Sequence, residues 1–458
     1  ELVSAQFVSE GTRDRAVVCR LATKAELVSF VETEYQRTVN TKREAVDLLL
    51  SAEDVNVGKL SRSIGIVENR LEREVSVAQL LFFGNTRQSL VDFVLRDLGV
   101  RRPPNWSVDR SLSFFESTSQ IEAHLKLAEQ GQSFFDHRKR LADDELSNYL
   151  VEAIAHDPLY QRRANKHNDR VARELERRGR LSDALEWFAV SPTSFAWERQ
   201  VRILTAKGDV EAAVQSFLGR SLETDAELDF ARRFSKKLSR VSDAVSPRVE
   251  AFEFPERHMI LNRSSDRVET AVIKHLTESG EQAFFAENQL INSLGVAGYW
   301  PALSAEIPGA FINPFQFAPL DLFEDQFLAR RTHVMKEVSE LFQTSNWRAI
   351  LLARWNSLRD YSIALWSPHV LPQNLLEDWL SQVDAVRLDA LLKHLFQDLR
   401  NRRSGQPDLV VRDTAGCWRF VEVKGPGDTL SDHQRRWLST LNSLGFGAEV
   451  LWVSYADD

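Results

Sequence analysis

Cysteine is nearly absent from the chain, since its 458 residues include only Cys19 and Cys417. Two cysteines cannot build a disulfide framework or a four-cysteine zinc site, so we expect a reducing, intracellular compartment. No run approaches the roughly 20 apolar residues that a membrane-spanning helix needs. The first residues lack the basic-then-apolar pattern of a secretory signal and an initiator methionine, so we expect a trimmed start.

Net positive charge is also lacking, because the chain carries a formal charge of −8 and a pI near 5.8. This balance excludes a protein evenly coated with positive charge, but not one that binds nucleic acid through a local basic patch. The hydrophobic fraction of 43% is that of a folded globular protein. The length predicts about two to four domains.

Residues 1–120 are predicted to form a mostly helical DNA-binding region. Within it, residues 21–50 have the pattern of two short helices, the second of which begins after the N-cap pair Asn40-Thr41. This helix pair resembles a SAP-type DNA-binding segment, although a plain helical hairpin fits the same pattern.

Residues 121–255 are predicted to be helix after helix with a weak internal repeat. A glycine, a small residue and an aromatic recur at an offset of 29 residues, as Gly179, Ala184 and Phe188 and again as Gly208, Ala213 and Phe217. The pattern is similar to tetratricopeptide (TPR) repeats, although their usual period is about 34 residues. We therefore predict a TPR-like helical domain.

Residues 260–458 are predicted to form a mixed domain whose first part is mainly helical. The first β-like runs are expected beyond residue 400, at 409–411, 420–423 and 450–453, with a helix at 431–444 before the last. The order strand, strand, helix, strand is typical of an α/β unit.

Charged residues gather at the hairpin that joins the first two of these runs. A turn signal at 413–416 predicts a three-residue loop with a left-handed glycine, Gly416. In the register that this loop sets, Asp408 stands opposite Glu422 with β-carbons about 5 Å apart. Lys424 lies two residues beyond Glu422 and shares its face. Three charged groups are therefore predicted to converge.

Two carboxylates this close repel each other, so one must take a proton unless a cation lies between them. A hard cation such as Mg²⁺ accepts one or two protein carboxylates together with water and substrate phosphate. Such an ion polarises a phosphoryl oxygen and generates a nucleophilic hydroxide. Asp408 and Glu422 are thus predicted metal ligands. Lys424 would orient or deprotonate the attacking water, or offset charge on the phosphorane.

A bare Glu-x-Lys is more typical of a solvent-facing pair on an edge strand, but here Pro407-Asp408 precedes it at hairpin distance. From about Arg400 to Val453 the chain closely resembles a VRR-NUC domain, a branch of the Pro-Asp…(Asp/Glu)-x-Lys nucleases. Within that branch it is similar to the Fanconi anaemia-associated nuclease family. The resemblance is carried by Gln406-Pro407-Asp408-Leu409-Val410-Val411, Phe420-Val421-Glu422-Val423-Lys424-Gly425 and Leu430-Ser431-Asp432-His433-Gln434.

This resemblance implies a restriction-endonuclease-like core, 5′-flap cleavage, 5′-to-3′ trimming and a role in interstrand crosslink repair. It places a further acidic metal ligand on a helix ahead of the core, where Glu287 matches and Glu278 and Glu281 are competitors. The implied ligands for Mg²⁺ or Mn²⁺ are Glu287, Asp408, Glu422 and the backbone carbonyl of Val423.

Gln434 matches a glutamine that follows the lysine strand in related nucleases. At a helix start it would help to hold a phosphate, unless it only caps the helix. The longer family members carry a zinc-finger-like ubiquitin-binding segment, and the chain contains no matching Cys/His cluster, so ubiquitin recruitment is not supported.

The most concentrated positive charge lies between residues 162 and 180, where eight Lys/Arg face three acidic residues. Five of these cations form one stripe at helical spacing, namely Arg163, Lys166, Arg170, Arg173 and Arg177. Such a stripe suits phosphate contact and reads DNA shape rather than sequence. A solvated face with local Arg–Glu pairs fits the pattern equally well, and the cations at 232–240 are a second candidate.

We interpret the chain as a structure-specific, metal-dependent DNA nuclease. Its predicted partner is branched DNA, either a 5′ flap or a crosslinked duplex, with no membrane; no protein partner is identified. We expect it in the cytoplasm and nucleoid of a bacterium, or in the nucleus of a eukaryote. The alternatives are a junction resolvase or mobile-element nuclease, against which the long helical body argues, and a non-catalytic DNA-binding scaffold. The intact Asp408, Glu422 and Lys424 argue against the scaffold.

Overall fold

The structure is a computed structural model that forms two compact units, Glu1–Thr86 and Arg87–Asp458. We treat the two units separately. No described helix is long and apolar enough to cross a lipid bilayer. The described residues are 8–51, 55–69, 71–88, 91–108, 115–152, 157–248, 252–263 and 265–456.

The first unit is a set of short helices with a two-stranded antiparallel sheet. The two helices predicted at residues 21–50 form as α2 (Lys24–Tyr35) and α3 (Lys42–Ser51). Thr41 caps α3, because its hydroxyl accepts from the backbone N–H of Glu44. The other elements are β1 (Val8–Glu10), α1 (Arg15–Leu21), α4 (Gly58–Ser63), β2 (Val67–Asn69) and α5 (Glu72–Phe83).

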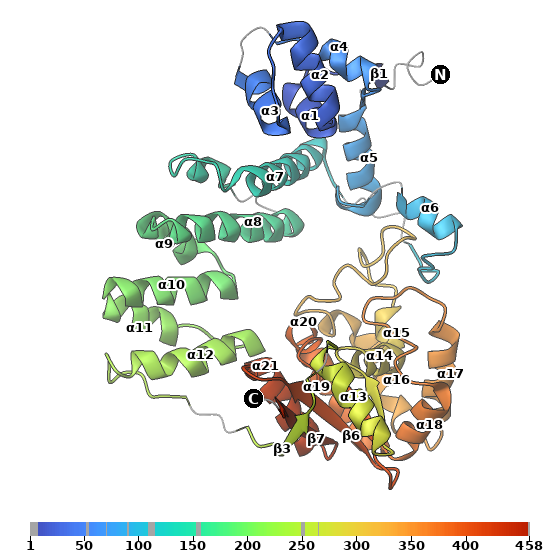
Figure 1. The fold of residues 1–458 in the computed structure, drawn as a ribbon. Helices are drawn as coiled ribbons and strands as arrows, with labels where there is room; N and C mark the ends of the chain where they lie inside the picture. The colour runs from blue at the N-terminus through green and yellow to red at the C-terminus, as the bar shows by residue number, and fades with distance from the viewer. Residues whose placement is uncertain are drawn as a thin grey trace. The chain divides into compact units, whose positions relative to one another are not determined.

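The second unit contains a stack of antiparallel helices (Figure 1). Gly179 and Gly208 both adopt left-handed backbone in the turns between paired helices, with φ of 81° and 80°, where a β-carbon would be strained. The alanine and phenylalanine of each predicted repeat are buried, so the 29-residue repeat is confirmed. Helix α6 (Val91–Asp97) precedes the stack and lies apart from it (Figure 1), with Phe93 against Phe315. The stack contains α7 (Thr118–His137), the 3₁₀ turn η1 (Leu146–Tyr149), α8 (Pro158–Arg177), α9 (Leu181–Val190), α10 (Ser194–Lys207), α11 (Val210–Leu218) and α12 (Asp225–Leu238).

A mixed five-stranded sheet, in the order β3-β7-β6-β5-β4, forms the core of the C-terminal region. β7 runs parallel to both β3 and β6, whereas β5 runs antiparallel to both β6 and β4. The three predicted strands and the helix between the last two are confirmed as β5, β6, β7 and α21. The elements are β3 (Glu256–Leu261), β4 (Gln282–Phe285), β5 (Leu409–Arg412), β6 (Trp418–Lys424), α21 (Asp432–Ser443) and β7 (Gly447–Tyr455).

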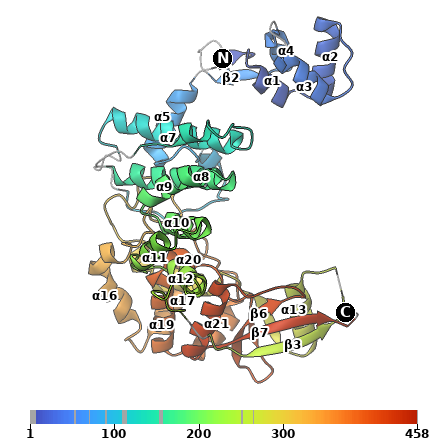
Figure 2. The ribbon, with the colours of Figure 1, turned by 90° about the vertical axis from the view of Figure 1, so that its left-hand side faces the viewer.

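Helices cover both faces of this sheet. On one face α13 packs over a core that includes Leu409 and Val421 (Figure 2). On the other face Val410 and Phe420 enter a larger core with α14, α17, α19 and α21. Successive strand residues point to opposite faces. The even-numbered residues of β5 and β6 therefore face the same helical layer as Val410 and Phe420. The helices are α13 (Val268–Glu278), α14 (Leu290–Gly298), α15 (Trp300–Leu303), η2 (Ala329–Arg331), α16 (Thr332–Leu341), α17 (Trp347–Leu358), α18 (Gln373–Ser381), α19 (Ala385–Gln397) and α20 (Leu399–Arg402).

The prediction that β-structure begins only beyond residue 400 is wrong, because β1 to β4 all precede it. β3 and β4 are the two edge strands of the large sheet. Each has one strand neighbour and is largely exposed or half-buried, so neither needs the apolar run that marks a central strand. The predicted fold class, a mostly helical body followed by an α/β core, is confirmed.

Candidate active site

The β5–β6 hairpin has the predicted register. Leu409 pairs with Val421, which places Asp408 opposite Glu422 at the open end of the ladder. The loop closes with the backbone N–H of Asp413 donating to the carbonyl of Cys417. Gly416 is left-handed, with a φ of 89°. The hairpin therefore brings the two carboxylates together as predicted.

Asp408, Glu422 and Lys424 lie on the face of the sheet covered by α14 and α21. Their exposed fractions are 8%, 1% and 8%. Lys424 Nζ lies 2.9 Å from Glu422 Oε1, and the backbone N–H of Val423 donates to Asp408 Oδ2 at 2.8 Å. The free-energy cost of burying charged side chains has to be offset by hydrogen bonds or ion pairs. These contacts provide a partner for one oxygen of each carboxylate.

The remaining charge is not neutralised by the protein. Burial, together with the neighbouring charge of Asp408, raises the pKa of Glu422 to about 8. Burial also raises the pKa of Asp408 to about 6, with the charge of Glu287 acting in the same direction. A cation between the two carboxyl groups would favour their charged forms and so lower both pKa values.

The donor set fits a divalent cation. Glu422 Oε2 is buried and has no hydrogen-bond partner among the described residues. The N–H and C=O groups of one strand residue point to the same side, so the Val423 carbonyl faces the same edge as its N–H, which donates to Asp408. No three His, Cys, Asp or Glu side chains of the described chain lie close enough to hold a metal. Two carboxylates, a carbonyl and water suit Mg²⁺.

Glu287 does not lie on a helix, so that part of the prediction is wrong. It occupies the turn between β4 and α14, because β4 pairs with β5 up to Phe285 and leaves no room for a helix there. Its backbone N–H donates to the carbonyl of Asp408 at 3.1 Å, and its exposed side chain lies near enough to raise the pKa of both Asp408 and Glu422. The competitor Glu281 instead pairs with Arg419.

Gln434 caps α21 and also contacts the buried Glu422, whereas its role in holding a phosphate stays a prediction. Its amide oxygen and backbone N–H complete a capping box with Ser431 at the start of α21. Its amide nitrogen donates to Glu422 Oε1. Capping therefore fixes the side chain that contacts the buried carboxylate.

A buried amide cluster, which the sequence analysis missed, fixes the loop that leads to Asp408. Gln406 is 2% exposed and donates to Asn292 Oδ1 at 2.8 Å. Trp437 Nε1 lies 3.1 Å from the carbonyl oxygens of both Arg402 and Ser404. The Gln406-Pro407-Asp408 motif was the available signal for Gln406, whereas nothing local marks Asn292.

The basic stripe lies on α8, whose neighbouring face of Ala164, Asn168, Val171 and Leu175 is buried. Arg163 turns toward α7, where it lies 3.1 Å from His124 Nδ1, and burial lowers its pKa to about 10.

The other four cations of the stripe divide into two pairs. Arg173 and Arg177 pair with Glu176 and Glu174. Lys166 and Arg170 are exposed and make no ion pair among the described residues.

Two cations of the second candidate at 232–240, and the separate pair Arg330 and Arg331, make ion pairs inside the protein. Arg232 and Arg233 both pair with Asp432 at the start of α21. Arg331 is fully buried and makes two contacts of 2.8 Å with Asp321. Arg330 lies beside it and pairs with the same carboxylate. These contacts engage Arg232, Arg233, Arg330 and Arg331 within the protein, whereas Lys236, Lys237 and Arg240 are exposed.

A sequence profile of the VRR-NUC domain matches residues 344–455. The "Fanconi-associated nuclease 1 homolog" of Pseudomonas aeruginosa is 30% identical over 402 residues, which are 83% of this chain and 68% of that protein. The human "Fanconi-associated nuclease 1" is 32% identical over 194 residues, 41% of this chain and 19% of the relative.

A similar solved structure, "Crystal structure of paFAN1 bound to 2nt 5'flap DNA with gap", has a TM-score of 0.86 at 26% identity. The match covers 100% of this chain and 85% of that one. The fold and site thus define a divalent-metal-dependent DNA nuclease, a hydrolase, with the Pro-Asp…(Asp/Glu)-x-Lys core. The chain belongs to the Fanconi-associated nuclease 1 family.

Proposed function

We propose that this nuclease cleaves 5′-flap DNA near the branch point, trims DNA from 5′ to 3′, and acts in interstrand crosslink repair. The observation that carries the proposal is the buried pair Asp408 and Glu422, with an unpartnered Glu422 oxygen beside Lys424. The similar solved structure with a bound 5′ flap supports the choice of substrate. The long helical body argues against a junction resolvase or mobile-element nuclease, and the intact Asp408, Glu422 and Lys424 argue against an inactive scaffold.

Asp408, Glu422 and the Val423 carbonyl would hold Mg²⁺ or Mn²⁺, with Glu287 completing the site through water. The ion would supply charge stabilisation at the phosphoryl oxygen and a bound nucleophilic water. Lys424 donates to Glu422 in the free protein, so we assign it the role of a donor to the attacking water or to a phosphoryl oxygen. Gln434 holds the Glu422 carboxylate in place.

The exposed cations on α8, Lys166 and Arg170, would bind the phosphate backbone of a duplex arm. Burial lowers the pKa of Lys166, and the nearby charges of Arg170, Arg87 and Arg400 lower it further. These cations come from three segments of the second unit, including α20 of the nuclease core. Cations gathered from several segments suit an extended phosphate chain, although Arg400 also pairs with Glu324. Arg163, Arg173 and Arg177 would contribute less, because they have partners within the protein.

We also propose three functional regions, namely residues 1–120 with the SAP-like segment at 21–50, the TPR-like residues 121–255, and the nuclease residues 260–458. The first region would bind DNA together with the second. The enzyme would act where chromosomal DNA lies, in a bacterial nucleoid or a eukaryotic nucleus.

The proposal is tested by cleavage of end-labelled 5′-flap, 3′-flap, four-way-junction, blunt duplex and single-stranded DNA. Each substrate is tested with Mg²⁺ and with Mn²⁺, under single-turnover conditions. We expect 5′-flap DNA to be cut fastest, near the branch, and no cutting in EDTA. Equal or faster cutting of four-way junctions would instead support a resolvase.

A further inference from the structure

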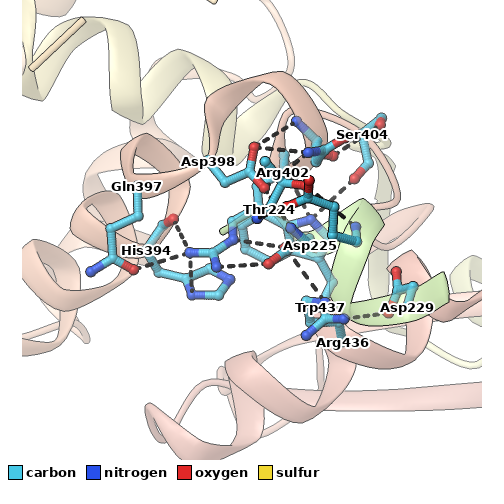
Figure 3. A network of polar contacts seen from close by, with 12 residues as sticks. Thr224, Asp225, Asp229, His394, Gln397, Asp398, Arg402, Ser404, Arg436 and Trp437 are labelled. Atoms are coloured by element: carbon cyan, nitrogen blue, oxygen red, sulfur yellow. Dashed lines mark hydrogen bonds and ion pairs between the residues drawn. The ribbon is translucent and has the colours of Figure 1, made fainter. Parts of the chain in front are cut away.

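Helix α12 links the TPR-like helices to the nuclease core through a buried polar network (Figure 3). One side of α12 is apolar and packs Phe230 and Phe234 into the core of the repeats. Its other side carries Asp225 and Asp229, one helical turn apart, with exposed fractions of 2% and 3%. Buried carboxylates need partners, and these partners belong to the nuclease core.

Asp225 holds the segment that leads to Asp408. Its carboxylate accepts from Arg402 in a bidentate pair, with Nε at 2.8 Å and Nη2 at 2.9 Å. Burial lowers the pKa of His394 to about 4, so the neutral ring can accept from the same guanidinium at 3.2 Å. Arg402 stands six residues before Asp408, at the start of the loop that Trp437 fixes through two carbonyls.

A second contact docks the first turn of α12 on the nuclease core. The backbone N–H of Asp225 donates to Asp398 Oδ2 at 2.8 Å. Asp398 is also the N-cap of α20, because its other oxygen accepts from the backbone N–H of Asn401. One carboxylate therefore satisfies free N–H groups of two helices that are far apart in sequence.

Asp229 holds the helix that carries Gln434. Its Oδ1 accepts from Arg436 Nη2, and Arg232 of the same helix pairs with Asp432. Asp432 and Arg436 are one turn apart on α21 and flank Gln434, which donates to Glu422. The first turns of α21 are thus held by the ion pairs with α12 and by the hydrogen bond from Gln434 to Glu422.

We propose that Asp225 and Asp229 are positioning residues for DNA cleavage, which act through Arg402 and Arg436 on the segments that carry Asp408 and Gln434. The TPR-like helices would then complete the catalytic centre as well as bind DNA. This inference rests on the proposed function, since it concerns the same site. A displacement of about 1 Å at a reacting group is enough to lower a rate up to a hundredfold.

The test compares Asp225→Asn and Asp229→Asn with Glu227→Gln in the full chain. Glu227 lies on the same helix and is equally buried, but its partners Arg220 and Ser194 belong to the repeats. Three quantities are measured: the thermal midpoint, the Kd for a 5′ flap in Ca²⁺, and the single-turnover cleavage rate in Mg²⁺. We expect the two aspartate variants to lose about tenfold or more in rate with Kd within about twofold. Glu227→Gln should lose thermal stability but keep its rate.

A double-mutant cycle with Gln434→Ala separates positioning from a general loss of stability. If Asp229 acts through Gln434, adding Asp229→Asn to Gln434→Ala should lower the rate little further. Full additivity, or an unchanged rate in both aspartate variants, overturns the inference. If Asp229→Asn does not fold, Asp229→Glu provides the same comparison with the charge kept. The unmodified protein is the reference for every rate. If it cut no DNA, that result would count against the proposed function and not against the positioning role of the two aspartates.

Discussion

Gln434 and Lys424 donate to the same oxygen of Glu422, Oε1. The other oxygen, Oε2, is buried without a partner among the described residues. Two donors on one oxygen fix the rotation of the carboxylate. The geometry therefore leaves Oε2 available to the cation that we propose for this site.

Glu422→Gln should nearly abolish cleavage, because the amide keeps the shape of the side chain but weakens the metal site. Loss of several kcal/mol of transition-state stabilisation corresponds to a rate reduced by about a thousandfold. DNA affinity measured in Ca²⁺ should change little. The control is Glu449→Gln on β7, a buried carboxylate paired with Arg419, which should lower stability alone. Near-normal turnover of Glu422→Gln in Mg²⁺ would show that the metal site lies elsewhere.

Metal affinity should rise with pH. The pKa values of Asp408 and Glu422 are raised to about 6 and about 8, and a cation has to displace the protons that they hold. We expect the Kd for Mg²⁺, measured by titration calorimetry, to fall from pH 6 to about pH 8 and then level. The protons released on binding should be measurable by repeating the titration in buffers of different ionisation enthalpy. A Kd independent of pH over this range would contradict the assignment.

The same two groups predict the pH dependence of stability in the metal-free protein. Unfolded carboxyl groups lose their protons near pH 4, whereas these two keep them to higher pH in the folded state. The free energy of unfolding should therefore fall as pH rises from about 4 to about 8. Saturating Mg²⁺ should oppose this decrease in the free energy of unfolding. The Glu422→Gln variant should show a smaller decrease over the same pH range. Chemical denaturation at several pH values, with and without Mg²⁺, measures both effects.

The catalytic hairpin could be predicted from the sequence because its information is local. The turn glycine sets the register, and the register alone places Asp408 against Glu422. Glu287 could be matched to a motif but not placed correctly, because its turn depends on the pairing of β4 with a strand more than 120 residues away. The pairing of Asp225 with Arg402 spans 177 residues and leaves no local pattern.

Gly405→Ala should impair cleavage through the first turn of α21. Gly405 has a φ of 79°, and a β-carbon there would lie 2.7 Å from Cβ of His433, the neighbour of Gln434. Gly208→Ala is the matched control, because Gly208 has a φ of 80° and open space around it. Both variants should lose about 1–2 kcal/mol of stability. Only Gly405→Ala should also lose about tenfold in single-turnover rate. Equal rates would mean that α21 tolerates the shift.

The last prediction concerns DNA binding by α8. Lys166 and Arg170 are exposed cations in a shared positive field, whereas Arg173 and Arg177 on the same helix are paired with glutamates. Lys166→Gln with Arg170→Gln should weaken 5′-flap binding in Ca²⁺. It should also reduce the slope of log K against log salt by about two, because each lost phosphate contact removes about 0.9. The maximal cleavage rate at saturating enzyme should stay unchanged, since both residues lie outside the metal site.

The double variant Arg173→Gln with Arg177→Gln removes the same charge from the same helix. Its cations already interact with Glu176 and Glu174, so fewer counterions are released when DNA binds and the slope should change less. If both double variants reduced the slope equally, the whole stripe would contact DNA and the internal pairs would open on binding. If neither changed it, α8 would be only a solvated face. The duplex arm would then have to be held by other cations, such as Arg400 of α20, whose replacement is the next measurement.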